Sequence, residues 1–217
     1  MTWNRGGTLI DEKNNVQLNS KEAVETLQSF QDLVHKEKVM PPNQHASAQQ
    51  DFIGGKVGML FMSGSSLAGL NTDIGDKFEL CVAYIPAVTE SHVPIGGNSL
   101  GIFKSTSEQE EASWKLIDFL TNTKNSSQAS IDSGYIAIRE SSLELPEFKA
   151  HLENNPNFKV TIDQLENLYG QAINPADSLI WGGIVKAFEA IEEDANANPQ
   201  DILDSLQKEV EAYLKDY

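Results

Sequence analysis

Residues 51–67 read DFIGGKVGMLFMSGSSL, an apolar run enclosed by a glycine pair and a serine-rich turn. The run Lys56–Met62 has the composition of a buried strand, and Gly54-Gly55 and Ser63–Ser66 are typical of the ends of such a strand. Two further runs have the same character: Phe78–Ile85 and Ser99–Phe103. We therefore expect three strands in this part of the chain.

Three other segments carry apolar residues at helical spacing. One follows Asn19-Ser20, with Ala23 and Leu27 on one face, and continues toward Pro41. The last begins at Asn198-Pro199, a capping residue followed by proline at the first helical position. The middle helix begins at Ser107 and places these residues on one face: Ala112, Leu116, Phe119 and Leu120. We expect each apolar face to pack against the protein. Strands alternating with helices favour an α/β fold.

The charge balance excludes several classes of function. The chain has 217 residues, with 16 Lys and Arg against 32 Asp and Glu, a formal net charge of −16. No nucleic-acid partner is expected, because such binding depends on basic groups that neutralise phosphates. The polybasic signature of a membrane-surface protein is also missing. An apolar fraction of 40% is too high for a disordered acidic tail.

The start of the chain has no apolar segment of the kind that signal peptides contain. A mature domain placed behind an added methionine would give the same pattern. Cys81 is the single cysteine, which excludes an internal disulfide, and its apolar surroundings predict a buried, inert thiol. The histidines lack the spacing of metal ligands, so neither a metal nor another cofactor is expected.

The turn Gly64-Ser65-Ser66-Leu67-Ala68 is one residue away from G-x-S-x-G, the nucleophile turn of serine hydrolases. Ser66 would be the nucleophile, with His92 or His151 as the base, but no motif places the acid. The alternative interpretation is a turn whose backbone N–H groups and hydroxyls bind a polar ligand. A plain interaction module without a ligand is a third possibility.

Two aromatic residues stand beside small residues. Trp181 lies in the sequence SLIWGG, where the glycines would leave one ring face uncovered, and Tyr135 follows Ser133-Gly134. Trp181 is either a core residue or a platform for the apolar face of a sugar, since an indole is broad and rigid.

In order along nearly the whole chain, these segments resemble family 1 of the extracellular solute-binding proteins of ABC importers. Asp51–Met59 is similar to that family's F-x-x-G-K-x-A-M segment, and Ser133–Ala137 resembles its T-G-Y-x-P turn, with Ala137 in place of the usual proline. Further similar segments are Ser63–Leu67, Val93–Leu100, Glu111–Leu120 and Asn198–Gln200.

The resemblance implies a periplasmic-binding-protein-like fold of type II, of which the chain covers the second half of a two-lobed protein. Residues 1–95 would belong to the C-terminal lobe, 96–138 would return to the N-terminal lobe, and 139–217 would complete the C-terminal lobe. The ligand-binding residues that it implies are Ser63, Ser65, Ser66, Gly96, Gly97, Tyr135 and Trp181.

The function implied by the resemblance is capture of a solute without catalysis. A carbohydrate or polyol would be held between the lobes and delivered to ABC permease subunits in the membrane. The full-length protein would be a monomer outside the cytoplasm, anchored as a lipoprotein. Family members that bind glycerol 3-phosphate use an arginine near the position of Trp181. Here the only arginines are Arg5 and Arg139, so a neutral carbohydrate is favoured.

Overall fold

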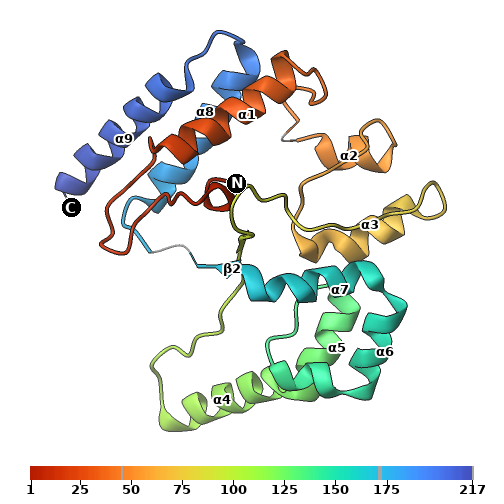
Figure 1. The fold of residues 1–217 in the computed structure, drawn as a ribbon. Coiled ribbons are helices and arrows are strands. Elements are labelled where there is room, and N and C mark those ends of the chain that lie inside the picture. The colour runs from red at the N-terminus through yellow and green to blue at the C-terminus, as the bar shows by residue number, and fades with distance from the viewer. Residues whose placement is uncertain (45, 171–172, 217) are drawn as a thin grey trace. The chain divides into compact units, whose positions relative to one another are not determined.

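A computed structural model describes residues 1–44, 46–170 and 173–216 (Figure 1). The described part of the chain is rich in helix and has two strands of two residues each. The α-helices are α1 Lys21–His35, α2 Ala48–Ile53, α3 Leu67–Ile74, α4 Ser107–Thr121, α5 Thr123–Ser133, α6 Pro146–Asn154, α7 Pro156–Asp163, α8 Asp177–Glu193 and α9 Pro199–Lys215. The 3-10 helices are η1 Trp3–Arg5, η2 Gly64–Ser66, η3 Glu140–Glu144 and η4 Gln164–Asn167. The strands, β1 Val93–Pro94 and β2 Leu168–Tyr169, pair in parallel.

The chain divides into two compact units. Unit 1 comprises Met1–Ala48, Ile85–Ile95 and Asn167–Tyr217, and unit 2 comprises Gln49–Tyr84 and Gly96–Glu166. The boundary after residue 95 coincides with a lobe boundary expected from the sequence, but those after residues 48, 84 and 166 were not expected, and the expected boundary after residue 138 lies inside unit 2. The assignment of segments to lobes therefore stays a prediction.

Unit 1 is built on three amphipathic helices, α1, α8 and α9, which pack on one another (Figure 1). Two of the three helices predicted from capping residues are therefore found here. The hydroxyl of Ser20 accepts a hydrogen bond from the N–H of Ala23, and the side chain of Asn198 accepts one from Gln200. α1 ends at His35, several residues before Pro41. The buried faces of the helices form two clusters: Ile10, Val16, Leu18, Ala176, Ile180, Leu206 and Val210, and Ala23, Leu27, Ala187, Ile191 and Leu203.

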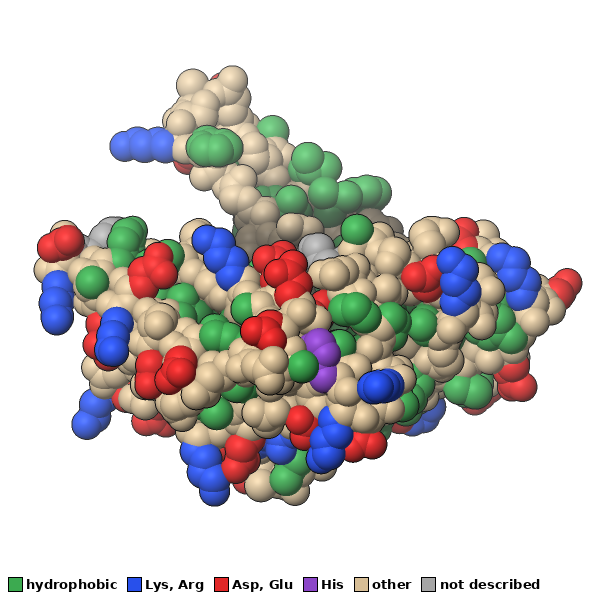
Figure 2. All heavy atoms as spheres, turned by 90° about the horizontal axis from the view of Figure 1, so that it is seen from above, with side chains coloured by type: hydrophobic (Ala, Val, Ile, Leu, Met, Phe, Trp, Pro, Cys, Tyr) green, Lys and Arg blue, Asp and Glu red, His purple; other side chains and the backbone are tan. Residues whose placement is uncertain are grey.

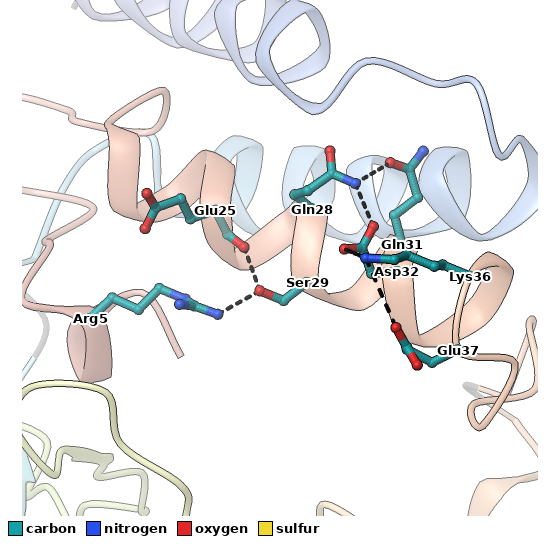
Figure 3. A network of polar contacts seen from close by, with 8 residues as sticks. All are labelled: Arg5, Glu25, Gln28, Ser29, Gln31, Asp32, Lys36 and Glu37. Carbon is teal, nitrogen blue, oxygen red and sulfur yellow. Dashed lines mark hydrogen bonds and ion pairs between the residues drawn. The ribbon is translucent and has the colours of Figure 1, made fainter.

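The outer face of α1 carries a polar network (Figure 3). The Arg5 guanidinium donates to Ser29 Oγ at 2.5 Å, and that hydroxyl donates to the carbonyl of Glu25 at 2.6 Å. Further along the helix, Gln28 donates to Gln31 and to Asp32. The bond from Arg5 to Ser29 joins η1 to α1, so one of the two arginines helps to hold unit 1 together.

Two adjacent glycines in α8 give a matched test of the α8–α9 contact. A Cβ added at Gly183 would lie 2.1 Å from Leu206 Cδ1, whereas nothing lies within 4 Å of a Cβ at Gly182. Leu206 belongs to the core, so Gly183→Ala is expected to destabilise unit 1 by about 1–3 kcal/mol through overpacking. Gly182→Ala is expected to be neutral or to stabilise by up to about 1 kcal/mol, from helix propensity alone. Urea unfolding of both variants measures the difference, and equal stabilities would contradict this account of the packing.

Unit 2 contains helices α2 to α7 around two apolar clusters. One cluster contains Phe52, Ile53, Leu70 and Ile74, and the other contains Leu67, Phe148 and Phe158. α4, the third predicted helix, is confirmed, with Thr106 as its cap. Pro146 and Pro156 stand at the first positions of α6 and α7, where their missing N–H groups need no partner.

The three strands expected from the sequence, Lys56–Met62, Phe78–Ile85 and Ser99–Phe103, are wrong as hydrogen-bonded strands. In the described part of the chain none of the three pairs with a neighbouring strand. In the second segment, Phe78–Ile85, alternate side chains do face the interior: Phe78, Leu80 and Val82 pack against the clusters of unit 2. Composition predicted a strand-like segment, but a strand also needs a partner backbone.

In the segment Phe78–Ile85, a side-chain amide takes the place of the partner backbone. Asn157 accepts from the N–H of Val82 at 2.9 Å and donates to the carbonyl of Leu80 at 2.6 Å. The same alternation turns Cys81 away from the clusters, so the thiol is exposed. The expectation of a buried thiol is therefore wrong.

The apolar face expected on α4 is not a packing face in this structure. No residue of α4 is buried, and Trp114 and Phe119 are 60% and 61% exposed. The periodicity correctly predicted an amphipathic helix, but it carries no information on what covers its apolar side. Figure 2 shows hydrophobic side chains at the surface among acidic and basic ones. No described helix combines the length and the apolar character needed to cross a membrane.

Candidate functional site

The serine turn Ser63–Ser66 leads into α3 and presents three hydroxyls. Ser63 accepts from the N–H of Ser65 at 3.4 Å, and the two hydroxyl oxygens lie 2.9 Å apart. Ser63 is exposed, while Ser65 and Ser66 are half-buried. A Cβ at Gly64 would lie 3.1 Å from Thr161 Cγ2, which shows that this turn runs close to α7. The turn is therefore close to α7 at Gly64 and exposed to solvent at Ser63.

The second turn of the site is Gly134-Tyr135, at the end of α5. Gly134 has φ +79°, a left-handed conformation that glycine adopts without steric cost. The hydroxyl of Ser130, which is 2% exposed, donates to the carbonyl of Tyr135 at 2.5 Å. The Tyr135 side chain is 55% exposed. The backbone is thus fixed from inside, and the ring is left free to contact a ligand.

These two turns lie side by side within unit 2. A Cβ at Gly134 would meet Ala68 Cβ at 3.3 Å and the carbonyl oxygen of Ser65 at 3.8 Å. The structure therefore brings Tyr135 next to the serine turn, although about seventy residues separate them in the chain.

The buried serines of α5 beside these turns were not predicted from the sequence. Ser126, Ser127 and Ser130 are 5%, 1% and 2% exposed, yet the sequence KNSSQAS is typical of a solvated helix. Ser126 Oγ accepts from the N–H of Ile138 at 3.1 Å. The available signal was their spacing, because Ser130 lies four residues after Ser126 and three after Ser127, and residues at these spacings share a helix face.

Trp181 lies on α8 in unit 1 and is 53% exposed. The interpretation as a core residue is therefore wrong, and a ring face is open to solvent. Its neighbour Ile180 is fully buried in the core, which orients this turn of the helix. That Trp181 joins the serine and tyrosine turns in one site stays a prediction, because it belongs to the other unit.

Gly96 and Gly97 follow β1 and are exposed. Neither has a positive φ, and no atom lies within 4 Å of a Cβ added at either position. The described part of the chain therefore shows no close backbone approach that would require glycine at these two positions. A role for their backbone groups in ligand binding stays a prediction.

The histidines proposed as a hydrolase base are engaged elsewhere. His92 Nε2 lies 3.2 Å from Glu90 Oε2, and the His92 ring packs edge-on against Tyr169. His151 Nδ1 lies 3.3 Å from the Asn155 amide. Among the described residues no hydrogen bond joins Ser66 to either histidine. Nothing in this geometry supports a serine nucleophile.

Both arginines are committed to internal contacts. Arg5 donates to Ser29, and Arg139 Nε donates to the carbonyl of Thr121 at 2.7 Å. Lys186, on the exposed side of α8, is the remaining basic residue close to Trp181 in sequence. The described residues also contain no cluster of three or more acidic, histidine or cysteine side chains that would hold a metal ion.

Comparison with known proteins agrees with this architecture. The chain is 27% identical over 214 residues to the maltotriose-binding protein of Pyrococcus abyssi, an alignment that covers 94% of this chain and 45% of that protein. UgpB of Mycobacterium tuberculosis, solved with glycerophosphocholine, superposes with a TM-score of 0.85 at 23% identity, covering 99% of this chain and 54% of UgpB. Maltose-bound MalE3 of T. maritima gives a TM-score of 0.79 at 24% identity, covering 98% and 55%.

The structural similarities establish the fold, and a match to a family model establishes the family. The expected periplasmic-binding-protein-like fold of type II is the fold of these structural neighbours, and the α/β class is confirmed in a helix-rich form. The chain spans about half the length of the relatives that it matches. The family model described as bacterial extracellular solute-binding protein matches residues 1–160. The chain belongs to the bacterial extracellular solute-binding protein family.

Proposed function

We propose that this chain is part of the solute-binding component of an ABC importer and that its ligand is a neutral carbohydrate or polyol. The protein would act outside the cytoplasm, anchored to the membrane, and would deliver its ligand to permease subunits without catalysing a reaction. The relatives support this ligand class, since they include a maltotriose-binding protein and the maltose-bound MalE3.

The exposed indole of Trp181 is the observation that carries the proposal. A tryptophan that is half-exposed on a helix anchored in the core gives a rigid apolar surface. The C–H face of a sugar ring packs well on such a surface, and polar groups around it fix the orientation of the ligand. Those polar groups would be the hydroxyls of the serine turn, Ser63–Ser66, and of Tyr135.

The distribution of basic groups favours a ligand without phosphate. Tight recognition of a phosphate commonly uses a bidentate arginine. Arg5 and Arg139 both donate to protein oxygens, and neither adjoins Trp181 in sequence. Lys186 would act only as a point charge.

Closure of two lobes on the ligand would couple binding to transport. A ligand shifts such an equilibrium only through contacts that differ between the open and closed states. Lobes that follow the two compact units would carry Trp181 on one lobe, and the serine turn, Gly96, Gly97 and Tyr135 on the other. A sugar in contact with both sets would favour the closed form.

Replacing Trp181 by alanine is expected to weaken sugar binding about tenfold or more, equivalent to about 1.4 kcal/mol. The measurement is the rise in Tm with maltotriose, other neutral oligosaccharides and polyols, on the whole protein that carries this chain. Saturating ligand at about 100 times its Kd stabilises the folded state by about 2.7 kcal/mol.

Trp114→Ala is the matched control, because Trp114 is also exposed, at 60%, but lies on α4. It should leave the sugar-induced rise unchanged. An equal loss in both variants would contradict the assignment of Trp181. The absence of any rise across the sugar and polyol panel would contradict the proposed function.

A further inference from the structure

Unit 2 contains a groove beside the contact between the serine turn and the Gly134-Tyr135 turn, and neither the three serines nor Tyr135 lines it. It lies between α3, the end of α5 and the corner where α6 meets α7, and its volume is about 470 Å³. That volume falls within the range of about 300–1,000 Å³ found for small-molecule sites. Its lining consists of Leu67, Ala68, Asn71, Ile131, Gly134, His151, Asn154, Asn155, Pro156, Asn157 and Phe158.

The lining of this groove contains no Asp, Glu, Lys or Arg, although 22% of the residues in the chain are charged. A charged ligand would lose its hydration there without gaining an ion pair, which is costly. The four asparagine amides suit a different ligand, because each presents both donors and an acceptor. Hydroxyl groups have the same dual character, so a ligand with several hydroxyls matches the amides.

Several of the polar atoms in the groove are free to bind. Among the described residues, the amide of Asn71 makes no hydrogen bond, and Asn71 is exposed on α3. Asn154 and Asn155 use their N–H groups to donate to the carbonyls of Ala150 and His151. Their Oδ1 atoms remain available as acceptors. Asn157 is different, because both ends of its amide hold the segment Leu80–Val82.

The orientation of His151 is fixed by its surroundings. The Asn155 amide lies 3.3 Å from Nδ1, and since the amide donates there, the neutral ring carries its proton on Nε2. The ring packs edge-on against Phe158 at 5.1 Å between centroids. His151 therefore adds one positioned donor to the acceptors of Asn154 and Asn155.

Apolar residues complete the groove. Leu67 and Phe158 are 5% and 3% exposed and belong to the same buried cluster, so this part of the lining is rigid. Ile131 and Pro156 add apolar surface. A rigid apolar base with polar groups around it is the usual construction of a sugar site, because a sugar ring has C–H faces and a hydroxyl edge.

We propose that this groove is a second binding site, for a neutral saccharide, in addition to the site that contains Trp181. The proposal goes beyond the proposed function and depends only on residues of unit 2. Asn71, Asn154, Asn155 and His151 bind the hydroxyls, and the apolar residues contact the ring.

The test follows the side-chain amide and indole N–H signals of the chain by NMR during titration. The probes are maltotriose, cellotriose, xylotriose and trehalose, with glycerol 3-phosphate as the charged comparison. Saturable shifts of the Asn71, Asn154 and Asn155 amides with a neutral sugar, and none with glycerol 3-phosphate, are the expected result. No saturable shift of these amides with any of the four sugars would overturn the proposal.

Asn71→Ala is the decisive variant, because an exposed amide without an internal hydrogen bond contributes nothing to folding. It is expected to weaken binding in the groove about fivefold to tenfold, the effect of one hydrogen bond. Glu153→Gln is the control, since Glu153 is exposed on α6 beside Asn154 but does not line the groove. Unchanged affinity in Asn71→Ala would overturn the proposal.

The indole signal of Trp181 separates this proposal from the proposed function. Shifts at Trp181 without shifts at the groove amides overturn the second site and leave the proposed function intact. Shifts at the groove amides that persist in Trp181→Ala support the second site, whatever Trp181 itself binds.

Discussion

Replacing Phe148 by alanine is expected to lower the free energy of unfolding of unit 2 by about 3–5 kcal/mol. Phe148 has 0% exposure, and its ring packs edge-on against Phe158 with centroids 6.2 Å apart. The same cluster includes Leu67, which begins α3 directly after the serine turn. A cavity at this position would therefore loosen both the serine turn and the base of the groove.

Phe103→Ala is the matched control for this variant, because Phe103 lies in the same unit and is 93% exposed. Its replacement is expected to change stability by no more than about 0.5 kcal/mol. Hydrogen exchange of the amides in α6 and α7, with those in α1 and α9 as an internal reference, measures the stability of unit 2 separately from unit 1. Similar protection of α6 and α7 in the two variants would contradict the packing described here.

The helices were predictable because their signals are local. A capping residue, a proline at the first position and apolar residues at helical spacing lie within one segment, and they placed the first residues of α4 and α9 to within a residue. The strands were not predictable in the same way. Lys56–Met62 has the composition of a strand, but a strand forms only where another backbone supplies hydrogen bonds, and no local pattern reports that partner.

The candidate site was predictable in part. The serine turn and Gly134-Tyr135 follow recognisable turn chemistry, and the structure brings these two turns together. The groove was not predicted, because its polar residues come from α3, α6 and α7 and share no spacing. The buried serines of α5 were missed for a related reason, since polar composition alone suggests exposure.

Two buried or half-buried amides have the same structural role in different units. Asn157 binds the backbone at Leu80 and Val82, and Gln207 binds the backbone at Val16 and Leu18. In each case one amide accepts from an N–H and donates to a carbonyl two residues away, as the backbone of a neighbouring strand would. Extended segments of this chain are thus held by side chains from helices rather than by a sheet.

Replacing Gln207 by alanine is expected to destabilise unit 1 by about 2–5 kcal/mol, because it leaves two buried backbone groups without partners. Gln207 Oε1 accepts from the N–H of Leu18 at 2.8 Å, and Nε2 donates to the carbonyl of Val16 at 3.0 Å. Leu18 and Val16 are 1% and 6% exposed, so water does not replace the lost bonds without opening the core. The expected loss of stability exceeds the loss expected for a single hydrogen bond, because both the oxygen and the nitrogen of the Gln207 amide bind the backbone.

Gln200→Ala is the matched control, because Gln200 lies on the exposed first turn of α9. It shows how much stability is lost when a glutamine that does not hold the Val16–Leu18 segment is removed. Among the residues that the structure describes, the side-chain amide of Gln200 donates to the Asp204 carboxylate alone, and its loss should cost no more than about 0.5 kcal/mol. Urea unfolding gives the two stabilities, and hydrogen exchange at the Leu18 amide reports the broken bond directly. If Leu18 remained as protected in Gln207→Ala as in Gln200→Ala, the amide would not be what holds this segment to α9. The contact of Val16 and Leu18 with the apolar core would then have to hold it alone.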